Sequence, residues 1–421
     1  MVELRALRAL RPVPDQLGSY LRPSRRDHKV LLQMLVEGKR IGTGLIADPC
    51  LADRQRDLLD EARRQGVETV LDSRAVDLST VGGFPRSGVR ELPWAGSEPH
   101  VPADLTGTAG VLAMQQLAAR VESGGHSAVL APTHYVEDVN DPWLGVDGEL
   151  THQLRSALDG RGLQQVLIYY PVVVRAALLH DADFRDEMVA GLAGLPIDAL
   201  WLRVHPFGTT TSGPLALRRY IEMCRALHSL GVPLVAEHSG TVGVALLAFG
   251  AVGGIESGVT IAEGVNLDSY LKAPKPDGKP FAAAPRVYLH VMGAFLDVKK
   301  AEAFFTNRGM KTTHGCSRSD CCPRGWRDMQ DNPRAHFAAQ RAREVAGLSV
   351  VPESLRAGHY MENFLRPATD RASRAIRAEP SLAPARKRLE SWRGTLGADL
   401  SANSAFTVSA PAAGKRLGRI A

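Results

Sequence analysis

Three of the five cysteines of this 421-residue chain lie in one short stretch, at Cys316, Cys321 and Cys322. The stretch, from His314 to Arg324, is rich in glycine, serine and proline and should form a loop. Thiolates this close together usually share a soft metal ion, most often tetrahedral Zn²⁺ bound by cysteine and histidine. We therefore predict a metal site; a redox pair and an unliganded turn are the alternatives. A fourth ligand is available from three histidines, His314, His336 and His359.

A second group of polar residues follows the apolar runs that we interpret as buried strands. They are mainly carboxylates and imidazoles, namely Asp72, Ser73, His134, His205, Glu237, His238, Glu256, Ser257 and His290. In a parallel barrel, chemistry collects at the carboxyl ends of the strands. Carboxylates and imidazoles there suit general acid–base catalysis, covalent catalysis by a carboxylate, or a catalytic metal. We predict an enzyme with its active site at these strand ends.

The elements that position these residues are short apolar runs alternating with amphipathic helices, typical of a parallel sheet buried on both faces. We predict strands at 30–36, 69–71, 127–131, 165–170, 199–204, 233–237, 253–255 and 287–290. Eight such strands indicate an α/β fold, a (β/α)₈ TIM barrel, with a C-terminal zinc-binding helical subdomain. A doubly wound sheet is the alternative, but the sequence contains neither of the glycine-rich nucleotide-binding fingerprints.

The pattern divides the chain into four parts. Residues 1–29 form an arginine-rich lead-in, 30–305 the barrel, 306–378 the Cys/His subdomain with its closing helices, and 379–421 a basic, flexible tail. No apolar run is long enough to span a membrane, and the few cysteines fit a reducing cytoplasm. A net charge of +6 is compatible with a nucleic-acid partner without requiring one.

The order of these features resembles the tRNA-guanine transglycosylase superfamily over roughly residues 60–378. Asp72-Ser73 stands where the family has D-S-G-G-F, and a Gly82-Gly83-Phe84 turn follows nine residues later. Gly254-Ile255-Glu256-Ser257 is similar to the segment that ends in the family's catalytic aspartate. The cysteine cluster stands where the family has C-x-C-x-x-C, and the helical pattern that follows it, with its late histidine, is also similar.

The resemblance implies an enzyme that replaces guanine with a 7-deazaguanine base, as in queuosine formation, in tRNA or DNA. Asp72 would be the general acid/base and Glu256 the nucleophile. Structural zinc would be bound by Cys316, Cys321, Cys322 and His359, with His336 as the second choice for the fourth ligand. Members often dimerise, which implies a homodimer or a partner subunit. The candidate substrate-binding residues are Ser73, Gly83, Phe84, His134, His205, His238 and Ser257.

Two other functions stay open. The first is a barrel that keeps the fold and the nucleic-acid surface but has lost catalysis; it is favoured by glutamate, rather than aspartate, at position 256. The second is an unrelated metal-dependent hydrolase. Its ligands would be His134, His205, His238 and Glu256. A metal at the barrel mouth would distinguish the hydrolase from the transglycosylase.

Overall fold

The computed structural model describes residues 17–261, 263–274 and 284–402. Eight parallel strands form a closed barrel in which the last strand pairs with the first. In order around the barrel they are β1 (Gly18–Arg22), β2 (Gly44–Ala47), β3 (Glu68–Leu71), β4 (Ala128–Leu130), β5 (Leu167–Arg175), β6 (Ala199–His205), β8 (Leu234–Ala236) and β9 (Gly254–Gly258). The predicted (β/α)₈ barrel is therefore confirmed.

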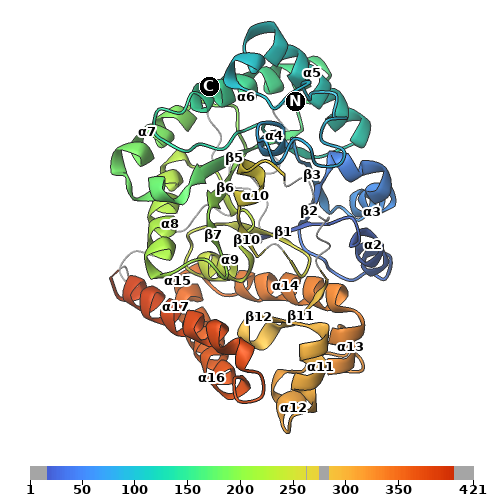
Figure 1. Ribbon diagram of the computed structural model, residues 1–421, viewed down its shortest axis with the longest axis vertical. Coiled ribbons are helices and arrows are strands. Elements are labelled where there is room, and N and C mark those ends of the chain that lie inside the picture. The colour runs from blue at the N-terminus through green and yellow to red at the C-terminus, as the bar shows by residue number, and fades with distance from the viewer. Residues whose placement is uncertain (1–16, 262, 275–283, 403–421) are drawn as a thin grey trace.

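A helix follows each of the first seven barrel strands on the outside of the barrel. These helices are α2 (His28–Val36), α3 (Ala52–Arg64), α5 (Gly107–Gly124), α6 (Trp143–Gly160), α7 (Ala182–Leu192), α8 (Pro214–Leu227) and α9 (Gly240–Ala248). The eighth helix comes from much later in the chain. It is α14 (Pro333–Ser349), which contacts α9, α2 and β1 and lies between the barrel and the other C-terminal elements (Figure 1).

The Cys/His subdomain is inserted between the last barrel strand and this closing helix. Its elements before α14 are β11 (Arg286–Leu289), β12 (Ala294–Asp297), α11 (Val298–Thr306), α12 (Met310–His314) and α13 (Trp326–Asp331). After α14 the chain continues through α15 (Glu353–Tyr360), α16 (Arg366–Ala375) and α17 (Ala383–Ala402). All of them lie on one side of the barrel (Figure 1).

Two of the eight predicted barrel strands do not belong to the barrel, and two barrel strands were missed. The run at 30–36 lies in helix α2, where Leu31, Met34 and Leu35 are buried at helical spacing. The run at 287–290 lies largely in β11, which pairs antiparallel with β12 outside the barrel. The missed strands β1 and β2 are short and contain glycine, so they carry little of the apolar signal that marks a strand.

The predicted boundaries change accordingly. The barrel begins at Gly18, inside the predicted lead-in, and is complete only with α14. The first part of the predicted flexible tail is helix α17, which buries Leu389, Trp392 and Leu396. Residues 1–16 of the lead-in and 403–421 of the tail lie outside the described residues.

The barrel interior, on the amino-terminal side of the strand ends, is filled by side chains. A cluster that includes Tyr20, Val70, Trp201 and Val235 fills it, and the Tyr20 hydroxyl donates to Glu68 at 2.8 Å. The barrel is thus a packed core and not a pore. Among the described residues, no helix is both long and apolar enough to cross a membrane.

Candidate active site and metal centre

Five charged side chains form one layer at the carboxyl end of the barrel. Alternate residues of a strand face the same side. Four of the five lie two positions beyond a residue of the interior cluster, such as Tyr20 or Trp201. The fifth, Glu256, lies two positions beyond Gly254, which packs on Val235 of that cluster. All five therefore point inward. The layer consists of Arg22 on β1, Asp72 after β3, Arg203 on β6, Glu237 after β8 and Glu256 on β9.

One arginine, Arg22, contacts all three carboxylates. Its Nε donates to Glu256 Oε1 at 3.0 Å, and its Nη2 donates to Glu237 Oε1 at 2.9 Å. Its Nη1 contacts Asp72 Oδ2, and Arg203 contacts the same oxygen of Glu237. A single guanidinium therefore ties together residues from four strands in a largely buried ionic network.

The neighbouring cations keep the two predicted catalytic carboxylates ionised. Burial alone would raise the pKa of Asp72, but the charges of Arg22 and Arg74 outweigh it and hold that pKa well below its usual range. Burial also opposes ionisation of Glu256, whose pKa is nevertheless lowered by His238 and Arg22. Burial lowers the pKa of His238, whereas the Arg22 guanidinium beside Glu256 stays charged.

The turn after β8 holds the other oxygen of Glu256. The backbone N–H of His238 donates to Glu256 Oε2 at 2.7 Å, and the N–H of Ser239 donates to the Glu256 carbonyl at 3.2 Å. To do so the chain takes left-handed backbone angles at His238 (φ 48°) and Gly240 (φ 60°). A side chain rarely tolerates such a conformation, so the surrounding contacts must hold the turn in place.

The predicted substrate-binding residues are only partly brought to this layer. His238 lies beside Glu256, and Ser73 and Ser257 are adjacent in sequence to Asp72 and Glu256 but are buried. His205, the last residue of β6, is also mostly buried, and its Nδ1 accepts the N–H of Leu267 at 3.0 Å.

The remaining predicted residues have contacts that fix the protein itself. His134 is buried, its Nδ1 lies 2.5 Å from Asp147 Oδ1, and its ring stacks on Trp143 with centroids 3.5 Å apart. Phe84 is buried in the main hydrophobic core. Its neighbour Gly83 packs so closely on Asp77 that a Cβ could not be accommodated. These residues hold the loops around the barrel mouth rather than line it.

Two short elements lie at the carboxyl end of the barrel, α4 (Ala75–Leu78) and α10 (Asp268–Leu271). They meet in a small apolar cluster that also contains Tyr135 and Val173. The Arg86 guanidinium stacks 3.7 Å above the Tyr270 ring, and the Gly82 N–H donates to the Tyr270 carbonyl at 2.7 Å. The Gly82-Gly83-Phe84 turn therefore supports α10.

The cysteine cluster forms a compact site with a histidine from α14. Ligand atoms of Cys316, Cys321, Cys322 and His336 all lie within 4.8 Å of one another. The Cys321 and Cys322 sulfurs are 3.5 Å apart, and His336 Nδ1 lies 3.3 Å from Cys322 Sγ. A tetrahedral ion with metal–sulfur bonds of about 2.3 Å needs ligand atoms separated by roughly 3.5 to 3.8 Å. The four residues therefore fit a structural metal ion.

The orientation of His336 also fits a ligand. Its Nε2 contacts the Tyr288 carbonyl at 2.9 Å, so Nε2 carries the proton and Nδ1 presents its lone pair to the cluster. The predicted fourth ligand, His359, is wrong: it is exposed and contacts Asn363. His314 is buried, but its Nε2 faces the Arg371 carbonyl at 3.3 Å.

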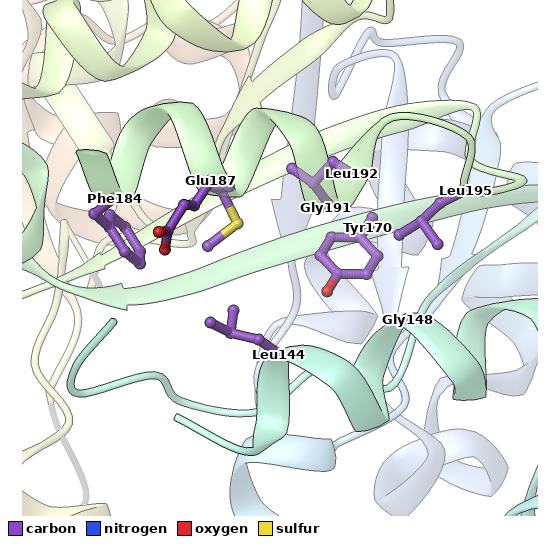
Figure 2. Close-up of a pocket in the computed structure, with 9 residues that line it drawn as sticks. Leu144, Gly148, Tyr170, Phe184, Glu187, Gly191, Leu192 and Leu195 are labelled. Atoms are coloured by element: carbon purple, nitrogen blue, oxygen red, sulfur yellow. The ribbon is translucent and has the colours of Figure 1, made fainter. Parts of the chain in front are cut away.

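Two cavities lie away from the charged layer. One of about 80 Å³ lies between α6 and α7 and is lined mostly by apolar side chains, including Leu144, Phe184 and Leu192 (Figure 2). The other, of about 520 Å³, lies between the loop at 93–105 and α5. Trp94 lines it and donates its indole N–H to the Ser73 carbonyl at 2.9 Å. None of the five layer residues lines either cavity.

Sequence reasoning missed the two arginines of the layer. Arg22 was missed because β1 lies in the segment interpreted as a lead-in. Arg203 was interpreted only as part of a strand, although a charged residue within an apolar run such as Leu-Trp-Leu-Arg-Val is itself a signal for an inward-facing polar site. Because alternate residues of a strand face the same side, the spacing of two residues places Arg203 on the same face as Trp201.

Comparisons with known proteins identify no family. No family model matches the chain, and no curated protein matches it. Solved structures that match include a candidate phosphonomutase from Burkholderia cenocepacia (14% identity, TM-score 0.35, 61% of this chain and 91% of that chain). Others are the carboxyl transferase domain of Rhizobium etli pyruvate carboxylase (11%, 0.38, 90% and 56%) and a xylanase from Cellvibrio japonicus (11%, 0.34, 60% and 87%). Likeness this low carries no argument about chemistry, and the fold rests on the closed strand order of the chain itself.

Proposed function

We propose that this protein is an enzyme that exchanges a guanine for a 7-deazaguanine base in tRNA or DNA. In this proposal Glu256 attacks the sugar carbon that bears the base, and Asp72 transfers the proton. The observation that carries the proposal is that one guanidinium, that of Arg22, contacts both carboxylates.

The shared arginine limits how far apart the two carboxylates can be. Two oxygens bonded to one guanidinium lie within roughly 9 Å of each other, because each hydrogen bond spans about 3 Å. Enzymes that cleave glycosidic bonds place their two carboxylates about 5 to 10 Å apart, one on each side of the sugar. Asp72 and Glu256 are thus close enough to act on one bond.

The charge of the layer suits this chemistry. Counting Asp72, Glu237 and Glu256 against Arg22 and Arg203, three negative charges and two positive charges leave a net charge of −1. Glycosidic bond cleavage develops positive charge on the sugar ring, which a net negative and largely buried site stabilises.

Base exchange requires Arg22 to move. Both oxygens of Glu256 are occupied, one by Arg22 and the other by the His238 N–H. The Arg22 side chain is 14% exposed, whereas the Glu256 side chain is fully buried. The arginine is therefore the group that can move. We propose that substrate binding displaces Arg22 from Glu256 Oε1 and frees that oxygen for attack.

The C-terminal region supports the same proposal. Members of the transglycosylase superfamily carry a zinc subdomain inserted near the end of the barrel. Here the Cys/His subdomain is inserted between β9 and the closing helix α14. We propose that Cys316, Cys321, Cys322 and His336 bind one zinc ion. With four protein ligands, its role would be structural.

A metal-dependent hydrolase is the second candidate, because Glu237, His238 and Glu256 also lie close enough together to bind an ion. Arg22 and Arg203 already neutralise the two carboxylates, so a divalent ion would have to displace both arginines. That competition makes the hydrolase the weaker proposal.

The direct test is incorporation of labelled guanine into tRNA and into duplex DNA. Wild-type protein should exchange the base in one of the two polymers. Glu256→Gln should lower the rate by about 10³-fold or more while polymer binding in a gel-shift assay is retained. Binding without exchange in the wild type would favour the non-catalytic binding subunit. Activity that depends on an added divalent ion would favour the hydrolase.

A further inference from the structure

Helix α14 carries a fully buried arginine on the side that faces the barrel. The Arg341 side chain is 1% exposed, and its Nη2 lies 3.2 Å from Glu263 Oε1 and 3.2 Å from Thr241 Oγ1. Its Nη1 contacts Glu344 Oε2 at 2.9 Å. A buried guanidinium with this set of partners fixes its neighbours as well as itself, because none of them can leave without exposing a charge to an apolar core.

Glu263 connects Arg341 to the start of α9. Its second oxygen, Oε2, accepts the Thr241 N–H at 2.6 Å, the Thr241 hydroxyl at 2.9 Å and the Thr209 hydroxyl at 2.9 Å. Gly240 packs against the same carboxylate so closely that a Cβ would overlap it. The Glu263 side chain therefore defines where the turn before α9 must lie.

That turn is the segment that binds the proposed nucleophile. His238, three residues before Thr241, donates its backbone N–H to Glu256, and both His238 and Gly240 have left-handed backbone angles. A strained turn of this kind persists only where surrounding contacts determine its conformation. The contacts at its far end are those of Glu263.

The other side of α14 faces the Cys/His cluster. His336 belongs to the cluster, and Gln340 Nε2 donates to Cys316 Sγ at 3.3 Å. The two sides are also joined through Tyr288, which accepts from His336 Nε2 at its carbonyl and donates its hydroxyl to Glu344 at 2.7 Å. Arg341 lies between His336 and Glu344 in the sequence of the helix.

We propose that Arg341 and Glu263 are positioning residues that couple metal binding at the Cys/His cluster to the order of the turn that holds Glu256. Bound metal fixes α14 through His336, the arginine fixes Glu263, and Glu263 fixes the turn. The inference rests on the proposed function only in naming Glu256 as the nucleophile. The coupling itself is a structural claim that needs no substrate.

Hydrogen exchange, measured by mass spectrometry on peptides that cover residues 238–242, tests the coupling. In the wild type, removal of zinc with EDTA should speed exchange there at least tenfold. The double variant Arg341→Met/Glu263→Gln removes both charges of this pair together, and Glu344 keeps its hydrogen bond from the Tyr288 hydroxyl. It should exchange fast with zinc bound, and EDTA should add little.

Two further variants keep the test decisive. Arg343→Met, on the same helix but paired with the exposed Asp320, should exchange as the wild type does. If the double variant does not fold, Thr241→Val removes one partner of Glu263 and should give a smaller acceleration of the same amides.

The proposal is wrong if these amides stay protected in the zinc-bound double variant or in Thr241→Val. It is also wrong if EDTA accelerates exchange by the same factor in the double variant as in the wild type. In a base-exchange assay, the folded double variant should lower kcat and leave KM unchanged. Absence of any exchange activity in the wild type would count against the proposed function and would leave the hydrogen-exchange result intact.

Discussion

The barrel mouth and the Cys/His cluster are assembled in opposite ways. The cluster takes three ligands from one loop of seven residues and a fourth from the nearby helix α14. The mouth takes its charged residues from five strands spread from Arg22 to Glu256. A local site can be recognised from spacing, whereas a site built across a barrel can be recognised only when every strand is placed correctly.

The two regions also differ in how their charges are balanced. At the mouth, the positive charges of Arg22 and Arg203 compensate three carboxylates within the protein. At the cluster, the neutral side-chain amide of Gln340 donates to Cys316 and Cys321. If the cluster binds the proposed metal ion, we expect its stability to depend on that cation, whereas the stability of the barrel mouth should not. The following predictions test this difference.

The largest expected effect is loss of a cluster ligand. Cys322→Ser should abolish metal binding and unfold the C-terminal subdomain, because structural zinc sites contribute on the order of 10 kcal/mol to folding. Metal content by mass spectrometry and the melting temperature measure the effect. Cys50→Ser, outside the cluster, and His359→Ala, the replaced candidate ligand, should both retain the metal. Metal loss in His359→Ala would contradict the assignment of His336.

The mouth should respond to the loss of its shared cation. Arg22→Met leaves buried carboxylates without their main partner and should lower the free energy of unfolding by about 3 to 5 kcal/mol. Metal content should stay unchanged. Urea unfolding measures the difference. The free energy of unfolding of Arg22→Lys should lie between those of Arg22→Met and the wild type. A neutral effect of Arg22→Met would mean that the network contributes nothing to stability.

The pH dependence of stability should identify the mouth carboxylates. The pKa of Asp72 is lowered in the folded state, so its contribution is present above the unfolded pKa of about 4 and is lost as the pH falls through the folded value. Unfolding free energy should therefore decrease between pH 5 and 2, by up to about 1.4 kcal/mol per pH unit for each such carboxylate. Asp72→Asn should flatten this slope, and identical slopes would refute the assignment.

The smallest effect is expected away from both regions. Gly148 lies inside α6 at the small apolar cavity, where an added Cβ would sit 3.8 Å from Leu195 (Figure 2). Gly148→Ala should raise the free energy of unfolding by roughly 0.5 to 1 kcal/mol through helix propensity. Metal content and base exchange should not change. A change in either would show that general stability, and not the local contacts, controls the two regions.

The sequence predicted the barrel from buried apolar runs, and it failed where the runs were short or served another element. Gly18–Arg22 was missed because its glycine, serine and tyrosine resemble a loop, although burial by the neighbouring strands makes it β1. The run at 30–36 was misinterpreted because a buried helix can be as apolar as a strand.

The same reasoning applies to the sites. Asp72 and Glu256 were placed at the mouth because each follows or ends a recognised strand. Their partner Arg22 was not predicted because its strand, β1, was missed. The three cysteines were found from spacing alone, but the choice among three histidines depended on how α14 packs, which the spacing does not encode. His336 was selected by tertiary contacts with Tyr288 and the barrel.

The most direct test of the central claim is to map the covalent intermediate. Wild-type protein would be incubated with tRNA or DNA, denatured, digested with nuclease and protease, and analysed by mass spectrometry for a sugar-linked peptide. We predict that the adduct lies on Glu256 and is absent from Glu256→Gln. An adduct on another residue, or full base exchange by Glu256→Gln, would contradict the assignment of Glu256 as the nucleophile.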